Sequence, residues 1–257
     1  MYYVGIDIGS TASKVYVIGE KGIYFVLPTG WSSKETASLI KEKLYVEGID
    51  VCSDDTIVTA TGYGRVAVDY ADYVITEITC HGRGGRELFG GDCLIVDVGG
   101  QDTKVILIEN GMVTDFLMND KCSAGTGKFL EVMANRLGVS LEELFAMAEK
   151  KGKVLPISSL CTVFAESEVI SYIGEGQPRE NIAAGVVDSV ANKVAQLCRK
   201  KPIGEQVVLT GGLSFSSYFT KILGQKIGAR IEAREMGRYA GAYGAALLGR
   251  EKYKKKQ

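Results

Sequence analysis

Two short segments of the chain repeat the same residues in the same order, and those residues could bind a phosphate group. Residues 6–18 (IDIGSTASKVYVI) and 96–108 (VDVGGQDTKVILI) share an aspartate, a glycine and a lysine at equal spacing: Asp7, Gly9 and Lys14 in the first, Asp97, Gly99 and Lys104 in the second. Glycine lets a backbone approach a ligand, exposed N–H groups bind phosphate oxygens, and aspartate can hold a hydrated cation. One such hairpin could be ordinary β-structure. Two of them favour a pair of related half-domains that face one nucleotide.

Three regions are therefore predicted to bind a nucleotide. They are the first hairpin (Gly9, Ser10, Thr11, Ala12, Ser13 and Lys14), the second hairpin with the turn that follows it (Gly99, Gly100, Gln101 and Asp102, then Gly125, Thr126 and Gly127), and a buried strand that ends at Gly211, Gly212 and Leu213. A Walker P-loop is excluded, because Cys122 and Phe129 occupy the positions around Gly127-Lys128 where that motif needs Gly and Ser or Thr.

Four side chains are candidates for the hydrolysis of a bound nucleotide. Asp7 or Asp97 could orient magnesium-bound water, and Gln101 or Asp102 could position the attacking water. For such a water, proximity matters more than basicity.

Two of the six cysteines could be metal ligands. Cys122 (in NDKCSAGTG) and Cys161 (in CTVFAESE) are each expected immediately before a helix, where the helix dipole and free N–H groups stabilise a thiolate. The alternative is two packed core cysteines. An iron–sulfur cluster usually takes four thiolates, so two per chain would suffice only across the two-fold axis of a homodimer. The spacing alone does not establish this. The other cysteines, Cys52, Cys80, Cys93 and Cys198, are expected to be structural.

The elements that would position these residues alternate between strands and helices, which predicts an α/β architecture. We expect three strands over 2–27, a helix over 33–45 with Leu39, Ile40 and Leu44 on one face, a strand over 56–61, and a helix beginning at Cys80. Strands should follow over 93–118, then helices after Gly127, over 181–200 and over 239–248. The repeat predicts two α/β halves, 1–92 and 93–238, with the last helix (about 239–250) packing back on the first half.

The composition excludes several broad classes. Thirty basic and 31 acidic residues leave a formal charge of −1, which argues against a general nucleic-acid or membrane-surface role. No stretch approaches the ~20 apolar residues of a membrane span, and no leader is expected before the first strand. We therefore expect a cytoplasmic protein whose cysteines are kept reduced.

Several motifs together resemble one known family. They are GIDIGSTASK, ATGYGR, EITCH, VDVGGQDTKV, NDKCSAGTGKFLEVMANRLGV, CTVFAESEVIS and LTGG. On these motifs the chain resembles, essentially from residue 3 to 248, the activator ATPases of 2-hydroxyacyl-CoA dehydratases, whose wider family includes ATPase subunits of benzoyl-CoA reductases. Both belong to the superfamily of acetate and sugar kinases, heat-shock chaperones and actin. The two cysteine motifs are the most specific part of the resemblance.

The resemblance implies a homodimer of actin-like (ribonuclease H-like) subunits, each with ATP or ADP and Mg²⁺ in the cleft between its halves. It also implies a single [4Fe–4S] cluster between the subunits, with Cys122 and Cys161 at the ligand positions. The first phosphate loop would be Ser10 to Lys14, and Gly211-Gly212 would contact the adenosine. Tyr63, Arg65 and His81 fit family motifs without an evident chemical role.

The predicted function is ATP-dependent transfer of one electron to a 2-hydroxyacyl-CoA dehydratase or a related iron–sulfur reductase, with a reduced ferredoxin or flavodoxin as the electron source. Two alternatives share the nucleotide motifs: a small-molecule kinase of the same superfamily, and a regulatory or chaperone-type ATPase without redox chemistry. Nothing in the chain identifies the acyl-CoA substrate, which would be bound by the partner.

Overall fold

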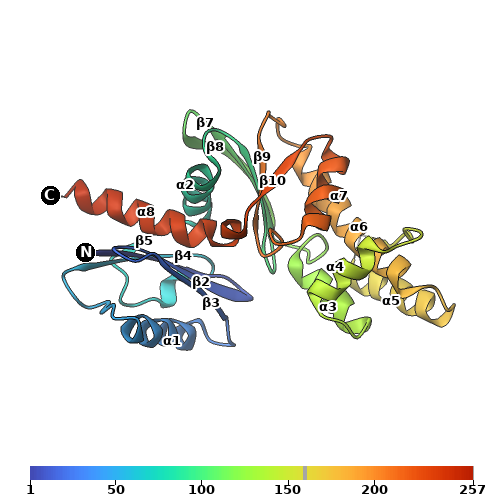
Figure 1. Ribbon diagram of the computed structural model, residues 1–257, viewed down its shortest axis with the longest axis horizontal. Helices are drawn as coiled ribbons and strands as arrows, with labels where there is room; N and C mark the ends of the chain where they lie inside the picture. The colour runs from blue at the N-terminus through green and yellow to red at the C-terminus, as the bar shows by residue number, and fades with distance from the viewer. Residues whose placement is uncertain (159–160, 257) are drawn as a thin grey trace. The chain divides into compact units, whose positions relative to one another are not determined.

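The computed structural model describes residues 1–158 and 161–256, which form two compact units (Figure 1). Unit 1 comprises Met1–Asp92, Ile106–Asp115 and Met236–Gln257. Unit 2 comprises Cys93–Val105 and Phe116–Glu235. Each unit contains a five-stranded sheet, although the outer turn of two strands in the second sheet is assigned to unit 1.

Unit 1 is built around a sheet with the strand order β3-β2-β1-β4-β5. Its elements are β1 (Tyr2–Ile8), β2 (Ala12–Ile18), β3 (Ile23–Pro28), α1 (Ser33–Val46), β4 (Thr56–Thr61), η1 (Arg65–Ala67), β5 (Tyr73–Val74), α2 (Glu77–Phe89) and α8 (Ala240–Lys254). β1 runs antiparallel to β2 and parallel to β4. Figure 1 shows α1 and α8 on opposite faces of this sheet. β1 is therefore covered on both sides, as its buried residues require.

Helix α1 begins where the sequence predicts, because the Ser32 hydroxyl accepts a hydrogen bond from the Glu35 amide and caps the helix. Ile40 and Leu44 are fully buried against the sheet. The prediction for Leu39 was wrong, since its side chain is 55% exposed. Leu39 lies one residue, about 100°, around the helix from Ile40, and only the narrower stripe reaches the core.

Helix α8 lies against α2 on one side and against β1 on another, with backbone close to backbone at both contacts. A methyl group at Gly84 of α2 would lie 1.9 Å from the Ala240 carbonyl oxygen, and one at Gly244 of α8 would lie 1.8 Å from that of Cys80. Likewise, a methyl group at Gly5 of β1 would lie 1.8 Å from the Ala242 oxygen. Only glycine allows these distances, so the small residues of α8 serve close packing within unit 1.

Unit 2 contains most of the second sheet, which has the order β10-β9-β6-β7-β8. The elements of this part of the chain are β6 (Leu94–Val98), β7 (Thr103–Glu109), β8 (Met112–Asn119), α3 (Gly127–Arg136), α4 (Leu141–Glu149), α5 (Thr162–Gly174), α6 (Arg179–Cys198), β9 (Val207–Gly211), α7 (Ser217–Ile227), β10 (Ile231–Ala233) and η2 (Glu235–Tyr239). β6 and β10 each pair with β9 in parallel. Helix α6 packs against α4 and α7 and is buried along most of its length.

One predicted helix start differs from the structure: α2 begins at Glu77, so Cys80 lies one turn inside the helix. α3 begins at Gly127, where a helix was predicted, with Thr126 as its capping position. The prediction that Cys122 immediately precedes a helix was wrong, because residues 123–126 separate it from the start of α3. Within the part of the chain that the structure describes, no helix is both long and apolar enough to cross a membrane.

Candidate functional site

The first hairpin places an aspartate and a lysine opposite each other. Asp7 of β1 is in register with Lys14 of β2, and 3.8 Å separates Asp7 Oδ2 from Lys14 Nζ. Asp7 is only 2% exposed, and among the described residues its Oδ1 atom has no hydrogen-bond partner. A buried carboxylate oxygen without a donor is a suitable acceptor for a hydrated cation.

The second hairpin repeats this arrangement with a different charge balance. Asp97 and Lys104 are buried, and 3.5 Å separates Lys104 Nζ from Asp97 Oδ2. The same ammonium lies 2.7 Å from Asp102 Oδ1, and the Thr210 hydroxyl donates to Asp97 Oδ1 at 3.2 Å. Asp102 therefore forms an ion pair with Lys104, which leaves it less suited to position a water than a carboxylate without such a partner.

In both units, a threonine and a glycine at the end of a parallel strand enclose the aspartate. Thr61 pairs with Asp7, and Thr210 pairs with Asp97. The following residues, Gly62 (φ +84°) and Gly211 (φ +82°), have the left-handed backbone that favours glycine. A methyl group would lie 2.3 Å from Asp7 Oδ1 at the first position and 2.5 Å from Asp97 Oδ1 at the second.

The repeat is therefore longer than the two hairpins. It includes ATG at 60–62 and LTG at 209–211, which lie far apart in the sequence and on strands of separate sheets. We expected Gly211 to contact adenosine, but assigned no such role to Gly62. The shared Thr-Gly after a buried strand could have revealed the correspondence. Arg65 maintains this turn in unit 1, because its Nη1 donates to the Gly62 carbonyl at 3.0 Å.

The predicted nucleotide-binding loops of unit 2 are hydrogen-bonded to one another. The Gly127 amide donates to the Gly99 carbonyl at 2.9 Å, and the Gly212 amide donates to the Val98 carbonyl at 3.0 Å. The Thr103 hydroxyl donates to the Gly125 carbonyl at 2.7 Å. The structure thus brings 99–102, 125–127 and 211–213 together beyond the end of β6. Gln101 is exposed there.

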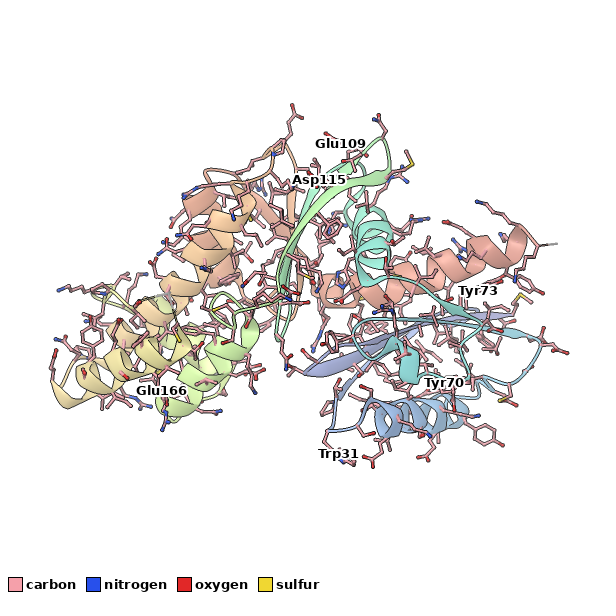
Figure 2. The ribbon with its side chains drawn as sticks, turned by 180° about the vertical axis from the view of Figure 1, so that it is seen from behind. Trp31, Tyr70, Tyr73, Glu109, Asp115 and Glu166 are labelled. Atoms are coloured by element: carbon pink, nitrogen blue, oxygen red, sulfur yellow. The ribbon has the colours of Figure 1, made fainter. Side chains whose placement is uncertain are left out.

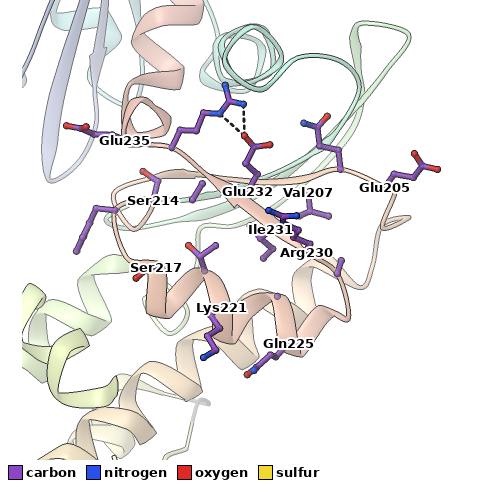
Figure 3. Close-up of a pocket in the computed structure, with 17 residues that line it drawn as sticks. Glu205, Val207, Ser214, Ser217, Lys221, Gln225, Arg230, Ile231, Glu232 and Glu235 are labelled. Atoms are coloured by element: carbon purple, nitrogen blue, oxygen red, sulfur yellow. Dashed lines mark hydrogen bonds and ion pairs between the residues drawn. The ribbon is translucent and has the colours of Figure 1, made fainter. Parts of the chain in front are cut away.

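A pocket of about 1100 Å³ adjoins the last of these loops (Figure 3). Ser214 and Phe215, which directly follow Leu213, line it together with Lys221 of α7 and Glu232 of β10. The Phe215 ring contacts the Phe145 ring edge-on at 5.7 Å between centroids, which fixes one apolar wall. Hydroxyl, ammonium and carboxylate groups make up much of the remainder, so the pocket suits a polar ligand.

The two candidate cluster cysteines are held near each other by their neighbours. The hydroxyl oxygens of Ser123 and Thr162 lie 2.7 Å apart, and these residues directly follow Cys122 and Cys161. Cys161 occupies the position before α5, as predicted, whereas Cys122 lies in the loop before α3. Both cysteines are half-buried and form no disulfide. Unit 2 thus has two free, incompletely buried cysteines next to a shared hydroxyl contact.

Three of the other cysteines are buried, as expected of structural residues. Burial raises the pKa of Cys80 and of Cys198 to about 12, so both remain neutral thiols at ordinary pH. The prediction for Cys52 was wrong: it is exposed, and Lys41 Nζ lies 3.4 Å from its sulfur. Because the thiolate is the metal ligand, these surroundings favour Cys122 and Cys161 over the buried pair.

The remaining motif residues of unit 1 lie in different surroundings. His81 is buried on α2, with its Nε2 atom 4.0 Å from Asp7 Oδ2 and 3.9 Å from Glu77 Oε1. Tyr63, by contrast, is 82% exposed beside the Gly62 turn. The sequence alone did not distinguish these two positions, one in the core and one at the surface.

Comparison with known proteins shows one family over almost the whole chain. The model of the BadF/BadG/BcrA/BcrD ATPase family matches residues 4–249. The (R)-2-hydroxyglutaryl-CoA dehydratase activating ATPase of Acidaminococcus fermentans is 41% identical over 98% of both chains. A component of the benzoyl-CoA reductase of Thauera aromatica is 29% identical over 98% of this chain and 94% of its own.

A solved structure has the same architecture. It is the activator of the 2-hydroxyisocaproyl-CoA dehydratase from Clostridium difficile with bound ADPNP, which is 37% identical, covers 100% of this chain and 97% of its own, and superposes with a TM-score of 0.92. The fold is thus the predicted actin-like α/β fold.

Proposed function

The chain belongs to the BadF/BadG/BcrA/BcrD ATPase family, and from that premise we propose that it is an ATP-dependent activator. It would donate one electron at a time to a 2-hydroxyacyl-CoA dehydratase or a related iron–sulfur reductase. The observation that carries the proposal is the pairing of Cys122 and Cys161 through the Ser123–Thr162 contact, in the unit that also contains the second phosphate loop.

The nucleotide part of the proposal rests on the two hairpins. In unit 1, Lys14 would bind phosphate oxygens and Asp7 would hold hydrated Mg²⁺, since Asp7 Oδ1 is buried and no described group donates to it. In unit 2, the loops at 99–102 and 125–127 would contact phosphate. The nucleoside would lie against 211–213 and the adjoining pocket. Of the four hydrolysis candidates, exposed Gln101 fits the water-positioning role better than ion-paired Asp102.

The residues present fit an iron–sulfur cluster shared by two copies of the chain. Cys122 and Cys161 would supply two thiolates per copy, and a [4Fe–4S] cluster bound in this way would provide low-potential one-electron transfer. Helix α5, which begins beside Cys161, exposes apolar side chains that a second copy would cover: Val163 is 66% exposed, Phe164 65% and Ile170 53%. We therefore propose a homodimer in contact along this helix.

The electron source would be a reduced ferredoxin or flavodoxin, from which one electron passes through the activator to its partner. Moving one charge through about 100 mV corresponds to about 2.3 kcal/mol, so nucleotide turnover could contribute a few hundred millivolts. The partners named for the relatives are dehydratases and a reductase that act on acyl-CoA compounds. The same class is proposed for this chain.

The test is to replace each candidate ligand and measure iron and acid-labile sulfide per dimer after oxygen-free reconstitution. Cys122→Ser and Cys161→Ser should each lose most of the iron. Cys52→Ser is the matched control, because Cys52 is also accessible and lies in unit 1. Full iron retention in both ligand variants, or a wild-type chain that binds no iron, would refute the assignment.

A further inference from the structure

The Ser123–Thr162 contact joins two side chains, so it can open or close without any change in secondary structure. We propose that these hydroxyls form a joint through which the second phosphate loop controls the relative position of Cys122 and Cys161. The inference rests on the proposed function and assigns both residues a positioning role in its regulation.

The first step of the connection runs from the phosphate loop to α3. The first amides of this helix donate to loop carbonyls: Gly127 to Gly99 at 2.9 Å, and Lys128 to Gly100 at 2.8 Å. Amides at a helix start have no partner within the helix, so here the loop satisfies them. A displacement of residues 99–102 therefore shifts the start of α3.

The second step runs from α3 to Cys122. Both the amide and the hydroxyl of Thr126 donate to the Ser123 carbonyl, at 3.0 and 2.7 Å. The Asn119 side-chain amide donates to the carbonyls of Cys122 at 3.0 Å and Ala124 at 3.2 Å. These bonds fix the backbone on both sides of Cys122, so this cysteine moves with the start of α3.

The third step reaches Cys161 on the neighbouring helix. Thr162 is the first residue of α5, and the Ala165 amide donates to the Cys161 carbonyl at 3.0 Å, so Cys161 moves with that helix. Glu166, labelled on α5 in Figure 2, forms an ion pair with Arg136 near the end of α3. Two contacts therefore link α3 and its preceding loop to α5: the Arg136–Glu166 ion pair and the Ser123–Thr162 hydrogen bond. The second of these lies next to the cysteines.

If the hydroxyl contact acts in this way, nucleotide binding should change the rate at which the cysteines release iron to a chelator. It should also change the rate at which the iron-free thiols are alkylated. In the wild-type chain, a non-hydrolysable ATP analogue should change the rate of chelator-driven iron release by about five-fold or more, the lower range of common coupling strengths. Thr162→Val keeps the size of the side chain and removes the hydroxyl, so the response should fall below about two-fold. Thr162→Ser should restore it.

The experiment uses the full chain, reconstituted without oxygen, with and without the analogue. Ser171→Ala is the control, because Ser171 lies on the same helix and its hydroxyl donates to a carbonyl of that helix, Ser167, at 3.0 Å. Ser123→Ala removes the other half of the joint and should match Thr162→Val. In the iron-free chain, affinity for the analogue should stay within about two-fold of wild type in every variant, because the reciprocal effect of bound iron on nucleotide affinity is then absent.

Iron-free chain provides the same comparison if a variant takes up no iron: the alkylation rates of Cys122 and Cys161 are then read residue by residue by mass spectrometry. The proposal is overturned if Thr162→Val keeps the wild-type response, if it loses affinity for the analogue, or if the wild-type chain itself does not respond. Failure of the proposed function has a different result, namely a wild-type chain without iron whose thiols still respond to nucleotide through Thr162.

Discussion

The two phosphate hairpins have the same backbone framework and different electrostatics. In each, a buried aspartate faces a lysine across the hairpin and a Thr-Gly turn from the neighbouring parallel strand. In unit 2, Asp102 pairs with the lysine at 2.7 Å. In unit 1 the corresponding residue is Ala12, and the Lys14 ammonium remains 3.8 Å from Asp7. The comparison indicates that Lys104 serves structure, whereas Lys14 can bind an external anion.

The largest expected effect comes from removing each lysine. Lys104→Met should lower the free energy of unfolding by about 3–5 kcal/mol, because Asp97 would keep a buried carboxylate without that ammonium. Lys14→Met should cost less stability than Lys104→Met, because the Lys14 ammonium is more exposed and lies 3.8 Å from Asp7 rather than 3.5 Å, and it should instead weaken nucleotide binding. Urea titrations and equilibrium binding of ATP would measure both. Equal destabilisation by the two changes would contradict the division of roles.

The two glycines that enclose the aspartates should behave alike. A methyl group at Gly62 or Gly211 would collide with a carboxylate and a carbonyl, and both residues have positive φ. Alanine at either position should therefore cost about 2–4 kcal/mol, as measured by thermal or urea unfolding. Gly48→Ala is a control for φ alone, since Gly48 has φ +82° with open space around it. If Gly48→Ala were as damaging as the other two, backbone strain rather than the collision would explain the loss.

The comparison can be sharpened by giving the first hairpin the carboxylate of the second. Ala12→Asp should pair with Lys14 and weaken ATP binding about ten-fold, equivalent to about 1.4 kcal/mol, with little change in stability. Ala12→Asn has nearly the same shape without the charge, so it should leave the affinity close to wild type. Isothermal titration with ATP would decide. An unchanged affinity in the aspartate variant would show that Lys14 is not a phosphate ligand.

The smallest expected difference concerns the two threonines. The Thr210 hydroxyl donates to Asp97 at 3.2 Å, so Thr210→Val should cost about 1 kcal/mol. Within the described residues, the buried Thr61 hydroxyl has no hydrogen-bond partner. Thr61→Val should therefore cost less than about 0.5 kcal/mol. A paired comparison of urea midpoints would resolve the two, and a larger loss for Thr61→Val would reverse the assignment.

The sequence predicted the structure best where the signal was local, that is, where a turn or a helix depends on residues close together in the chain. The repeated Asp-Gly-Lys spacing predicted both hairpins, because glycine turns and alternating apolar residues are local signals. The start of α1 was also predicted from a local signal, the apolar periodicity over 33–45, and it agrees with the structure. What remained hidden depends on contacts between distant segments. The partnership of Asp7 with Gly62 and the hydrogen bond from Thr210 to Asp97 require the register of strands, which spacing does not reveal.

The cysteines illustrate the same limit. The motifs around Cys122 and Cys161 indicated that they differ from the other four, but nothing in the local sequence showed that Cys52 is exposed, in the turn that follows α1. The contact between Ser123 and Thr162 joins residues 39 positions apart, so no local pattern predicts it. Nor did helix periodicity predict that Leu39 would face solvent, since it does not show how wide a stripe of the helix the sheet covers.

The close backbone packing of α8 against α2 and β1, here called the glycine seam (Gly5, Gly84 and Gly244), determines how unit 1 can open. Methyl groups at Gly84, Gly244 or Gly5 would overlap carbonyl oxygens, so the three elements have no clearance in which to slide. The amide hydrogens along this seam should exchange with deuterium together, and only when the unit opens as a whole. Variation during evolution is therefore expected in the outer loops of unit 1, while the glycine seam stays unchanged because even one added carbon would separate it.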